Sequence, residues 1–298
     1  MRGFPIEYIE PVFRPPSEAR SLILQVTNGC SYNQCSFCEM YQEPQKKFKP
    51  KPRDEIEKEV KGIAALQPGI SRFFLADGDA MTLSFRRLKD ILLCIGEHFP
   101  YMERVTAYCL PRNVKKKSVE QLRELRELGL SMVYVGCESG DDKVLELVKK
   151  GETFESSKDA LLKLKAAGIK SSVMILNGLG GRKYSRQHAI NSARLMNETQ
   201  PEFVSTLVVS FPLGEERFRA GFNGDYEPLC QNGLFEEIRL LIDSFELENT
   251  VFRSDHASNY LVLKGNLGED KQAMLDKIDL ALNKPGSIPL RQEWQRGL

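Results

Sequence analysis

The stretch SLILQVTNGCSYNQCSFCEMY, residues 21–41, joins an apolar run of strand length to three closely spaced cysteines. Cys30, Cys35 and Cys38 are the only such cluster in the sequence. Thiolates at this spacing suit soft metals, and three of them leave one corner of a tetrahedral or cuboidal site open to an exogenous ligand. The stretch therefore predicts a first strand followed by a metal-binding loop with an open coordination position.

A structural zinc site and disulfide bonds are the alternatives to this interpretation. A zinc site needs a fourth ligand, and the histidines at 98, 188 and 256 all lie far away in the sequence. Seven cysteines is an odd count, and the first twenty residues are too polar and proline-rich for an export signal. We therefore expect a reducing, cytoplasmic compartment. A zinc- or cluster-stabilised binding module stays open as the alternative function.

Apolar runs of strand length alternate with helical patterns along the chain. The runs lie at 21–27, 72–76, 104–109, 132–137, 171–176 and 203–211. Between them, Ile56, Val60 and Ile63 recur at helical spacing, and a similar stripe at 119–128 is followed by Gly129. Crossover helices of this length require parallel strands with right-handed connections, so the sequence predicts an α/β fold.

Basic and acidic residues nearly balance. The 42 lysines and arginines and the 41 aspartates and glutamates give a formal net charge of +1. This balance gives no overall attraction to nucleic acid or to an anionic membrane, and no apolar run reaches the roughly 18 residues of a membrane span. We expect neither a membrane nor a nucleic-acid partner, and we interpret the basic stretch QKKFKPKPR, 45–53, as a solvated face.

Several segments share their order and spacing with one enzyme family. The cysteine run, with Phe37 before its last cysteine, resembles the cluster loop of the radical S-adenosylmethionine (radical SAM) enzymes. The usual family spacing is C-x3-C-x2-C, and this chain has C-x4-C-x2-C. The turn of Asp77, Gly78 and Asp79 stands where the family carries a GGE-like motif.

Two later segments extend the resemblance. MVYVGCESGDDKVLELVKKG, 132–151, is similar to the G-x-ESG-x-D-x-x-L segment of relatives of the oxygen-independent coproporphyrinogen oxidases and of the B12-linked members. SSVMILNGLGG, 171–181, is similar to a family element in which a strand ends in a glycine turn.

The resemblance implies a six-stranded partial (β/α)6 barrel at 21–214. An N-terminal segment, 1–20, would precede the barrel, and a mostly helical C-terminal extension, 215–298, would follow it. In parallel α/β folds the loops after the carboxyl ends of the strands gather at one rim. We therefore expect the motifs to meet at that rim.

The resemblance also implies the chemistry. Cys30, Cys35 and Cys38 would hold a [4Fe-4S] cluster whose unique iron binds S-adenosylmethionine, and reductive cleavage would give a 5'-deoxyadenosyl radical that abstracts hydrogen from an unidentified substrate. A reducing electron donor such as flavodoxin or ferredoxin would be a partner. Phe37 would lie against the adenine or shield the cluster.

By the same resemblance, other motif residues bind S-adenosylmethionine. The turn at 77–79 would meet the methionine amino group through a backbone carbonyl or the Asp79 carboxylate, which are suitable acceptors. Glu138, with Ser139 beside it, would meet the ribose hydroxyls or the amino group, and a surface ion pair is the alternative for Glu138. Arg112 would pair with the carboxylate. Gly178 would allow close approach of the cofactor, and an ordinary turn, the commonest role of glycine, is the alternative.

The segment RSDHASNYLVLKG, 253–265, concentrates polar side chains in a stretch that we predict to be non-helical. Two interpretations are open. The side chains could cap the local backbone, as is common in turns. Alternatively, His256 and Tyr260 face the barrel mouth and bind or protonate the substrate as catalytic residues.

Overall fold

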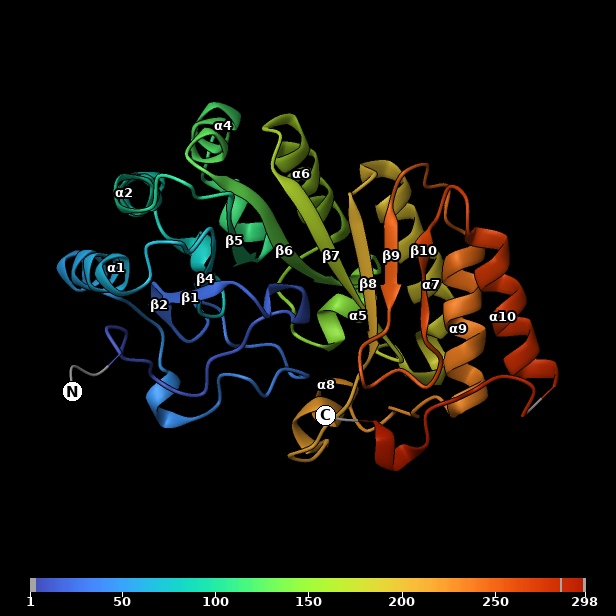
Figure 1. Cartoon of the computed structure of the whole chain (residues 1–298). Helices are drawn as coiled ribbons and strands as arrows, with labels where there is room; N and C mark the ends of the chain where they lie inside the picture. The colour runs from blue at the N-terminus through green and yellow to red at the C-terminus, as the bar shows by residue number, and fades with distance from the viewer. Residues whose placement is uncertain (1–3, 285, 297–298) are drawn as a thin grey trace. The chain divides into compact units, whose positions relative to one another are not determined.

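The computed structural model describes residues 4–284 and 286–296 (Figure 1). The described residues form two compact units, the first made of 4–33, 40–135 and 162–171 and the second of 34–39, 136–161, 172–284 and 286–296. The predicted domain boundaries after residues 20 and 214 stay predictions. Positions 1–3 of the predicted N-terminal segment, and 285, 297 and 298 of the predicted extension, lie outside the described residues.

The first unit is built on neighbouring parallel strands. They pair in the order β1 (Leu22–Gln25), β4 (Arg72–Ala76), β5 (Arg104–Cys109) and β6 (Leu130–Glu138, of which this unit holds the part up to Val135). In β4 the run from Phe73 to Ala76 is completely buried, as an apolar parallel strand covered on both faces should be. A short antiparallel pair, β2 (Thr27–Asn28) with β3 (Lys49–Pro50), flanks the cysteine loop in the sequence.

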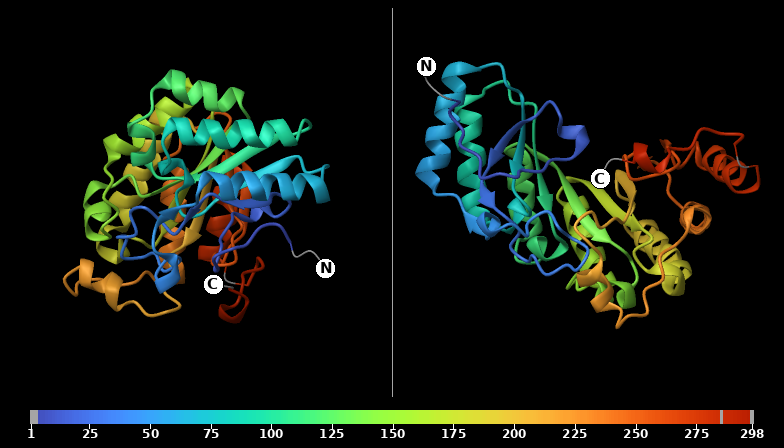
Figure 2. Two further views of the ribbon diagram at one scale, coloured as in Figure 1. Left: turned by 90° about the vertical axis from the view of Figure 1, so that its left-hand side faces the viewer. Right: turned by 90° about the horizontal axis from the view of Figure 1, so that it is seen from below.

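Amphipathic helices cover the strands of the first unit. They are α1 (Arg53–Leu66), α2 (Phe85–His98), α3 (Pro111–Lys115) and α4 (Val119–Glu127), and α1 and α2 lie side by side (Figures 1 and 2). The predicted stripes are confirmed, because Ile56, Val60 and Ile63 on α1 and Leu122 and Leu125 on α4 are buried. Burying each such side chain contributes about 1.5–3 kcal/mol.

The second unit also carries a mostly parallel set of strands. In order they are β7 (Lys170–Asn177, in this unit from Ser172), β8 (Phe203–Val208), β9 (Val251–Ser254) and β10 (Leu263–Asn266). The β7–β8 and β8–β9 pairs are parallel, and β9–β10 is antiparallel. The helix α9 (Gln231–Asp243) packs against both α7 (Gly181–Thr199) and α10 (Lys271–Asn283).

Two short helices of the second unit share an apolar cluster. They are α5 (Asp142–Leu147) and α8 (Glu216–Gly221). The cluster also includes residues next to these helices and at the end of β7, and its buried members are Val144, Val148, Leu176, Leu179, Phe218, Phe222 and Tyr226. A further helix is α6 (Phe154–Ala166), and short 3-10 helices occur at Pro16–Glu18, Pro44–Lys46, Ala80–Thr82 and Glu293–Gln295.

The predicted α/β class is confirmed, because each of the six predicted runs overlaps one of the parallel strands. The extension predicted at 215–298 contains the helices α8, α9 and α10, together with β9 and β10. The stretch 253–265 is non-helical, as predicted, and it contains the end of β9 and the start of β10. These strands have four residues each, too few to show a clear alternation of apolar and polar side chains, yet Phe252 and Leu263 are buried.

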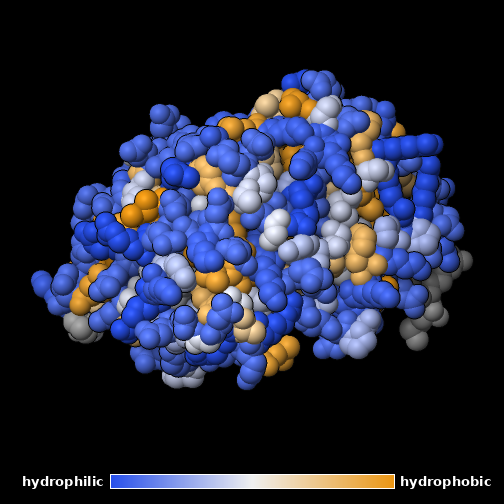
Figure 3. All heavy atoms as spheres, turned by 180° about the vertical axis from the view of Figure 1, so that it is seen from behind, coloured by the Kyte–Doolittle hydropathy of each residue, from blue (hydrophilic) through white to orange (hydrophobic). Residues whose placement is uncertain are grey.

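One face of the molecule is largely polar. On the face drawn in Figure 3, hydrophilic side chains predominate and apolar ones occur in small scattered groups. Within 4–284 and 286–296, no helix combines the length and the apolar character that crossing a bilayer demands.

Candidate active site

In the first unit, the turn after β4 lies directly against the first cysteine. A Cβ atom built on Gly78 would come within 2.7 Å of both the Cys30 Cα and the Gly29 carbonyl oxygen, closer than real Cβ contacts. Gly29 itself has a φ of +66°, and a Cβ there would meet the Lys46 carbonyl oxygen at 1.9 Å. Both glycines are therefore required by the close approach of backbone segments around Cys30.

Asp79 fixes the residue that follows Cys30. Its buried carboxylate accepts hydrogen bonds from the Ser31 backbone N–H (2.7 Å), the Ser31 hydroxyl and the Asn113 side-chain amide (3.0 Å). Burial raises the pKa of Asp79, and these hydrogen bonds together with the charge of Arg112 partly oppose that rise. The carboxylate thus joins the cysteine loop to α3, and Asn113 is a contributor that sequence reasoning missed.

Asp77 forms a completely buried ion pair with Lys46. One carboxylate oxygen also lies 3.4 Å from the Gly29 N–H, and the Lys46 ammonium donates to the Ile9 carbonyl at 2.8 Å. The interpretation of 45–53 as a solvated face is therefore wrong for Lys46. Removing one partner of a buried pair leaves an uncompensated charge at a cost of about 3–5 kcal/mol.

The other oxygen of Asp77, Oδ1, is buried and makes no hydrogen bond to any part of the chain that the structure describes. Asp77 Oδ1 is therefore a buried acceptor beside the Gly78 turn that receives no hydrogen bond from the described residues.

Arg112 lies on α3, immediately after β5. Its guanidinium stacks on the ring of Tyr32, 3.8 Å from the ring centroid. Tyr32 follows Cys30 by two positions, so the ends of both β4 and β5 contact the start of the cysteine loop. Stacking of this kind contributes about 0.5–2 kcal/mol and fixes the plane of the guanidinium.

In the second unit, Glu138 at the end of β6 adopts a left-handed conformation with φ of +66°. Its carboxylate pairs with the Lys150 ammonium at 3.1 Å, and the two side chains are only 11% and 3% exposed. The ion-pair alternative for Glu138 therefore exists in the structure, although the pair is buried rather than on the surface. A Cβ on Gly136 would meet Glu138 Oε1 at 2.3 Å, so this glycine leaves room for the carboxylate.

Lys150 connects this ion pair with the second half of the cysteine loop. Burial by itself lowers the pKa of Lys150, but the charges of Glu138 and Cys35 raise it above its ordinary value. The ammonium lies 5.8 Å from the centroid of the Phe37 ring, which packs partly buried against the apolar cluster of α5 and α8. Sequence reasoning missed Lys150, because a lysine at the end of a helix is usually solvated.

The backbone of this half of the loop is tied to two helices. The Ser36 N–H donates to the Val148 carbonyl at 2.9 Å. The guanidinium of Arg217, on α8, donates to the carbonyl oxygens of Cys35 (2.8 Å) and Cys38 (3.0 Å). Nothing local in the sequence indicates a role for Arg217.

Ser139 and Gly178 have protein partners within the second unit. The Ser139 hydroxyl forms a hydrogen bond with His188 Nδ1 (2.8 Å). The Gly178 N–H donates to Glu237 Oε1 (2.6 Å), and its carbonyl accepts from the Tyr226 hydroxyl (3.1 Å). The roles of Ser139 and Gly178 in binding S-adenosylmethionine stay predictions.

His256 and Tyr260 lie between β9 and β10. Nδ1 of His256 lies 2.9 Å from the Ser258 hydroxyl and accepts from the Ser258 N–H at 3.1 Å, and burial lowers the pKa of the imidazole. The Tyr260 hydroxyl bonds to Glu293, Arg296 stacks 3.8 Å from its ring centroid, and burial raises the pKa of the phenol to about 12. The His256 contacts are those of the local-cap interpretation, whereas Tyr260 contacts residues more than thirty positions further along the chain. The substrate role of both residues stays a prediction.

Comparison with known proteins decides the family. The family model described as the Radical SAM superfamily matches residues 24–196, more than half of the 298 residues. The chain belongs to the radical SAM superfamily. Members of this superfamily use a [4Fe-4S] cluster and S-adenosylmethionine, which confirms the two predicted cofactors at the level of the family.

Individual relatives of this radical SAM chain are distant. The anaerobic magnesium-protoporphyrin IX monomethyl ester cyclase of Cereibacter sphaeroides is 24% identical over 244 residues, 78% of this chain and 34% of the cyclase. The tRNA uridine(34) acetyltransferase of Methanocaldococcus infernus is 24% identical over 177 residues, 56% of this chain and 32% of the relative. The chain thus spans about a third of the length of the curated relatives that it matches.

Among solved structures, coproporphyrinogen III oxidase from Escherichia coli, a radical SAM enzyme, superposes with a TM-score of 0.58 at 16% identity. The match covers 75% of this chain and 51% of the oxidase. At this identity the likeness shows the fold alone.

The donor set of the radical SAM loop has the chemistry that a cluster needs. Within the described residues, Cys30, Cys35 and Cys38 take part in no disulfide bond, and the close contacts at Gly29 and Gly78 leave no room for a side chain at either glycine. Within the described residues, no three His, Cys, Asp or Glu side chains are gathered as a preformed ion site. The ligand roles of the three cysteines therefore stay predictions that rest on the donor chemistry and the sequence spacing.

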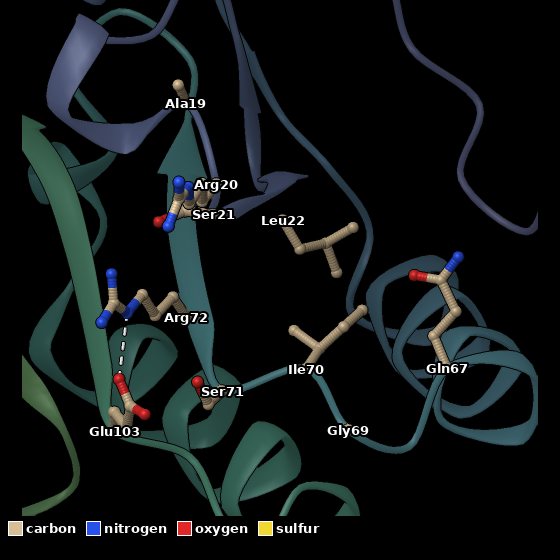
Figure 4. A pocket seen from close by; sticks show the side chains of 10 residues that line it. All are labelled: Ala19, Arg20, Ser21, Leu22, Gln67, Gly69, Ile70, Ser71, Arg72 and Glu103. Atoms are coloured by element: carbon tan, nitrogen blue, oxygen red, sulfur yellow. Dashed lines mark hydrogen bonds and ion pairs between the residues drawn. The ribbon is translucent and has the colours of Figure 1, made fainter.

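A cavity of about 500 Å³ in the first unit lies at the amino-terminal ends of β1 and β4, away from the strand ends that contact the cysteine loop (Figure 4). It is lined by residues of 19–22, 67–72 and Glu103, and an ion pair of 2.9 Å joins Arg72 to Glu103 across its wall. Because β4 begins at Arg72 and ends beside Asp77, about 16 Å of strand separates this cavity from the turn that contacts Cys30. The cavity is distinct from the candidate active site.

Proposed function

We propose that this chain is a radical SAM enzyme in which Cys30, Cys35 and Cys38 hold the cluster and S-adenosylmethionine binds at its open position. The observation that carries the proposal is the contact between the Gly78 turn and the Cys30 backbone, which brings the end of β4 against the first ligand. When bound, the cluster supplies the electron that cleaves the sulfonium, and the resulting radical abstracts hydrogen from the substrate.

Residues of the first unit are suited to the polar end of S-adenosylmethionine. The buried Asp77 Oδ1 would accept a hydrogen bond from the amino group, since an ammonium needs acceptors and this oxygen makes no hydrogen bond to the described residues. Arg112, with its plane fixed on Tyr32, would donate two hydrogen bonds to the carboxylate. Asp79 would keep the loop in place through Ser31.

In the second unit, we propose that Glu138 would accept from the ribose hydroxyls while Lys150 balances its charge. Phe37 would shield the cluster side of the loop from water, because its ring is packed against the apolar cluster of α5 and α8. A flavodoxin or ferredoxin in a reducing cytoplasm would supply electrons. The names of the two curated relatives imply unrelated substrates, so no substrate is carried over to this chain.

Iron content tests the proposal. After anaerobic reconstitution we expect a brown protein with about four irons per chain, and replacement of any one of Cys30, Cys35 or Cys38 by Ala should remove most of that iron. Cys230→Ser is the matched control, since Cys230 is exposed and outside the loop, and it should bind iron like the wild type. A colourless protein that retains zinc in air would favour the binding-module alternative and overturn the proposal.

A further inference from the structure

The segment from Phe211 to Tyr226, here called the α8 segment, follows the region that matches the family model by fifteen residues or more. It nevertheless contacts the cysteine loop within the second unit. Arg217, on α8, donates to the carbonyl oxygens of both Cys35 and Cys38. The Cys38 N–H also bonds to the Cys35 carbonyl at 3.3 Å. The guanidinium therefore binds a turn that contains two of the three cysteines of the loop.

One further contact reaches the same turn, and another joins the α8 segment to α5. The Leu213 N–H lies 3.3 Å from the Glu39 carboxylate. Gly221 lies so close to α5 that a Cβ on it would meet the Leu147 carbonyl oxygen at 2.1 Å, which only glycine allows. Of the two cysteines in this half of the loop, Cys35 is the more deeply buried, with 8% of its surface exposed. The α8 segment thus packs on the Cys35–Glu39 turn at more than one point.

The α8 segment is itself well anchored. Phe218 packs against Phe211 and Tyr226 with ring centroids 4.4 and 4.8 Å apart. The Tyr226 hydroxyl bonds to the Gly178 carbonyl, which ties the segment to the turn after β7. Arg217 therefore extends from a segment that is already held in place. Little of the free energy of its two hydrogen bonds is offset by the conformational entropy of ordering that segment.

We propose that Arg217 is a positioning residue that fixes the Cys35–Cys38 turn and keeps a permanent positive charge beside it. An arginine donates to two acceptors from one rigid plane and stays charged at any physiological pH, which a lysine matches only in its charge. Hydrogen bonds from a charged donor are about twice as strong as neutral ones. The hold on the turn is independent of the proposed function, whereas its importance for a bound cluster rests on that function.

Thiol alkylation of the full-length apoprotein tests the hold on the turn. In Arg217→Gln we expect Cys35 to react with iodoacetamide about tenfold faster than in the wild type, as loss of hydrogen bonds from a charged donor should allow. Cys137, buried in β6, should react at an unchanged slow rate and serves as an internal reference for intact folding. Mass spectrometry of the digested protein gives the rate for each cysteine.

Arg219→Gln is the matched control, because Arg219 lies on the same helix but bonds to Glu215 and to the Tyr226 carbonyl instead of the cysteine loop. It should leave the rate at Cys35 close to that of the wild type. An unchanged Cys35 rate in Arg217→Gln, or an equal increase in Arg219→Gln, would overturn the proposal.

The reduction potential of the reconstituted protein tests the charge. Removing a nearby positive charge makes a cluster harder to reduce, so Arg217→Gln should have a more negative potential than the wild type. Arg217→Lys keeps the charge and should restore most of the potential while its Cys35 alkylation stays fast. A wild-type potential in Arg217→Gln would contradict the charge role. A wild-type protein that binds no cluster would instead refute the proposed function and leave the alkylation result standing.

Discussion

At the scale of single residues, the strongest constraints lie around Cys30. Gly78 shows no positive φ, so its requirement is purely one of space. In Gly78→Ala we expect the new methyl group to push the β4 turn away from Cys30, with a loss of about 1–3 kcal/mol in unfolding free energy and a lower iron content after reconstitution. Urea unfolding and an iron assay measure the two effects.

Gly69→Ala is the matched control for that variant, because a Cβ at Gly69 meets nothing within 4 Å. Its unfolding free energy should change by less than about 1 kcal/mol. Equal stability and equal iron content in both variants would show that the turn does not support the cysteine loop.

Glu237 offers a test by pH. Burial raises the pKa of Glu237 above its ordinary value of 4.5, partly offset by the charge of His188 and by hydrogen bonds from Ser185 and the Gly178 N–H. A carboxyl group whose pKa is raised in the folded state makes its full contribution to stability at acidic pH. That contribution is lost as pH rises through the folded pKa. Glu237→Gln should therefore match the wild type at acidic pH and be more stable by about 1–3 kcal/mol near neutral pH.

Urea unfolding over a series of pH values measures this difference. Glu236→Gln, at an exposed neighbour on the same helix, should show no such trend. A constant difference between Glu237→Gln and the wild type at all pH values would contradict the assigned cause.

At the scale of elements, the α8 segment supports the second half of the cysteine loop. Phe218→Ala should leave a cavity among the rings of Phe211, Phe222 and Tyr226 and cost about 3–5 kcal/mol. Because the ring anchors the base of Arg217, alkylation of Cys35 should also become faster. Thermal or urea unfolding, combined with residue-resolved alkylation, measures both consequences.

Leu213→Ala provides the comparison within the same segment, since the Leu213 side chain is 74% exposed. Stability should change by no more than about 0.5 kcal/mol, and the Cys35 rate should stay at the wild-type level. If Phe218→Ala left both quantities unchanged, the segment would not be the support inferred here.

Elements with a clear local pattern could be predicted from the sequence. A window of about a dozen residues is enough to recognise the stripes on α1 and α4 and the apolar runs of β4 and β7, because burial on one or both faces dictates residue type. β9 and β10 are too short for such a signal, and their pairing depends on contacts with β8 and with each other.

The contacts of individual side chains were harder to predict. Lys46 stands in a basic run whose other lysines are more exposed, and only the fold brings its ammonium to Asp77. Arg217 is separated from Cys38 by 179 positions, so no local pattern could connect them. The cysteine spacing, in contrast, is a local feature, and it led to the correct superfamily.

At the scale of the whole molecule, the proposed function requires that the radical SAM loop bind a cluster with one open position. Residues that the sequence could not connect with the loop, including Asn113, Lys150 and Arg217, contact or surround it within their own units. Their contacts hold the backbone of the cysteine loop at both of its ends.

The most direct measurement is the release of 5'-deoxyadenosine and methionine when the reconstituted protein is incubated anaerobically with S-adenosylmethionine and dithionite. We expect equal amounts of both products from the wild type and from Cys230→Ser, and none above background from Cys35→Ala. A wild-type protein that carries its full iron content and yet releases neither product would contradict the central claim.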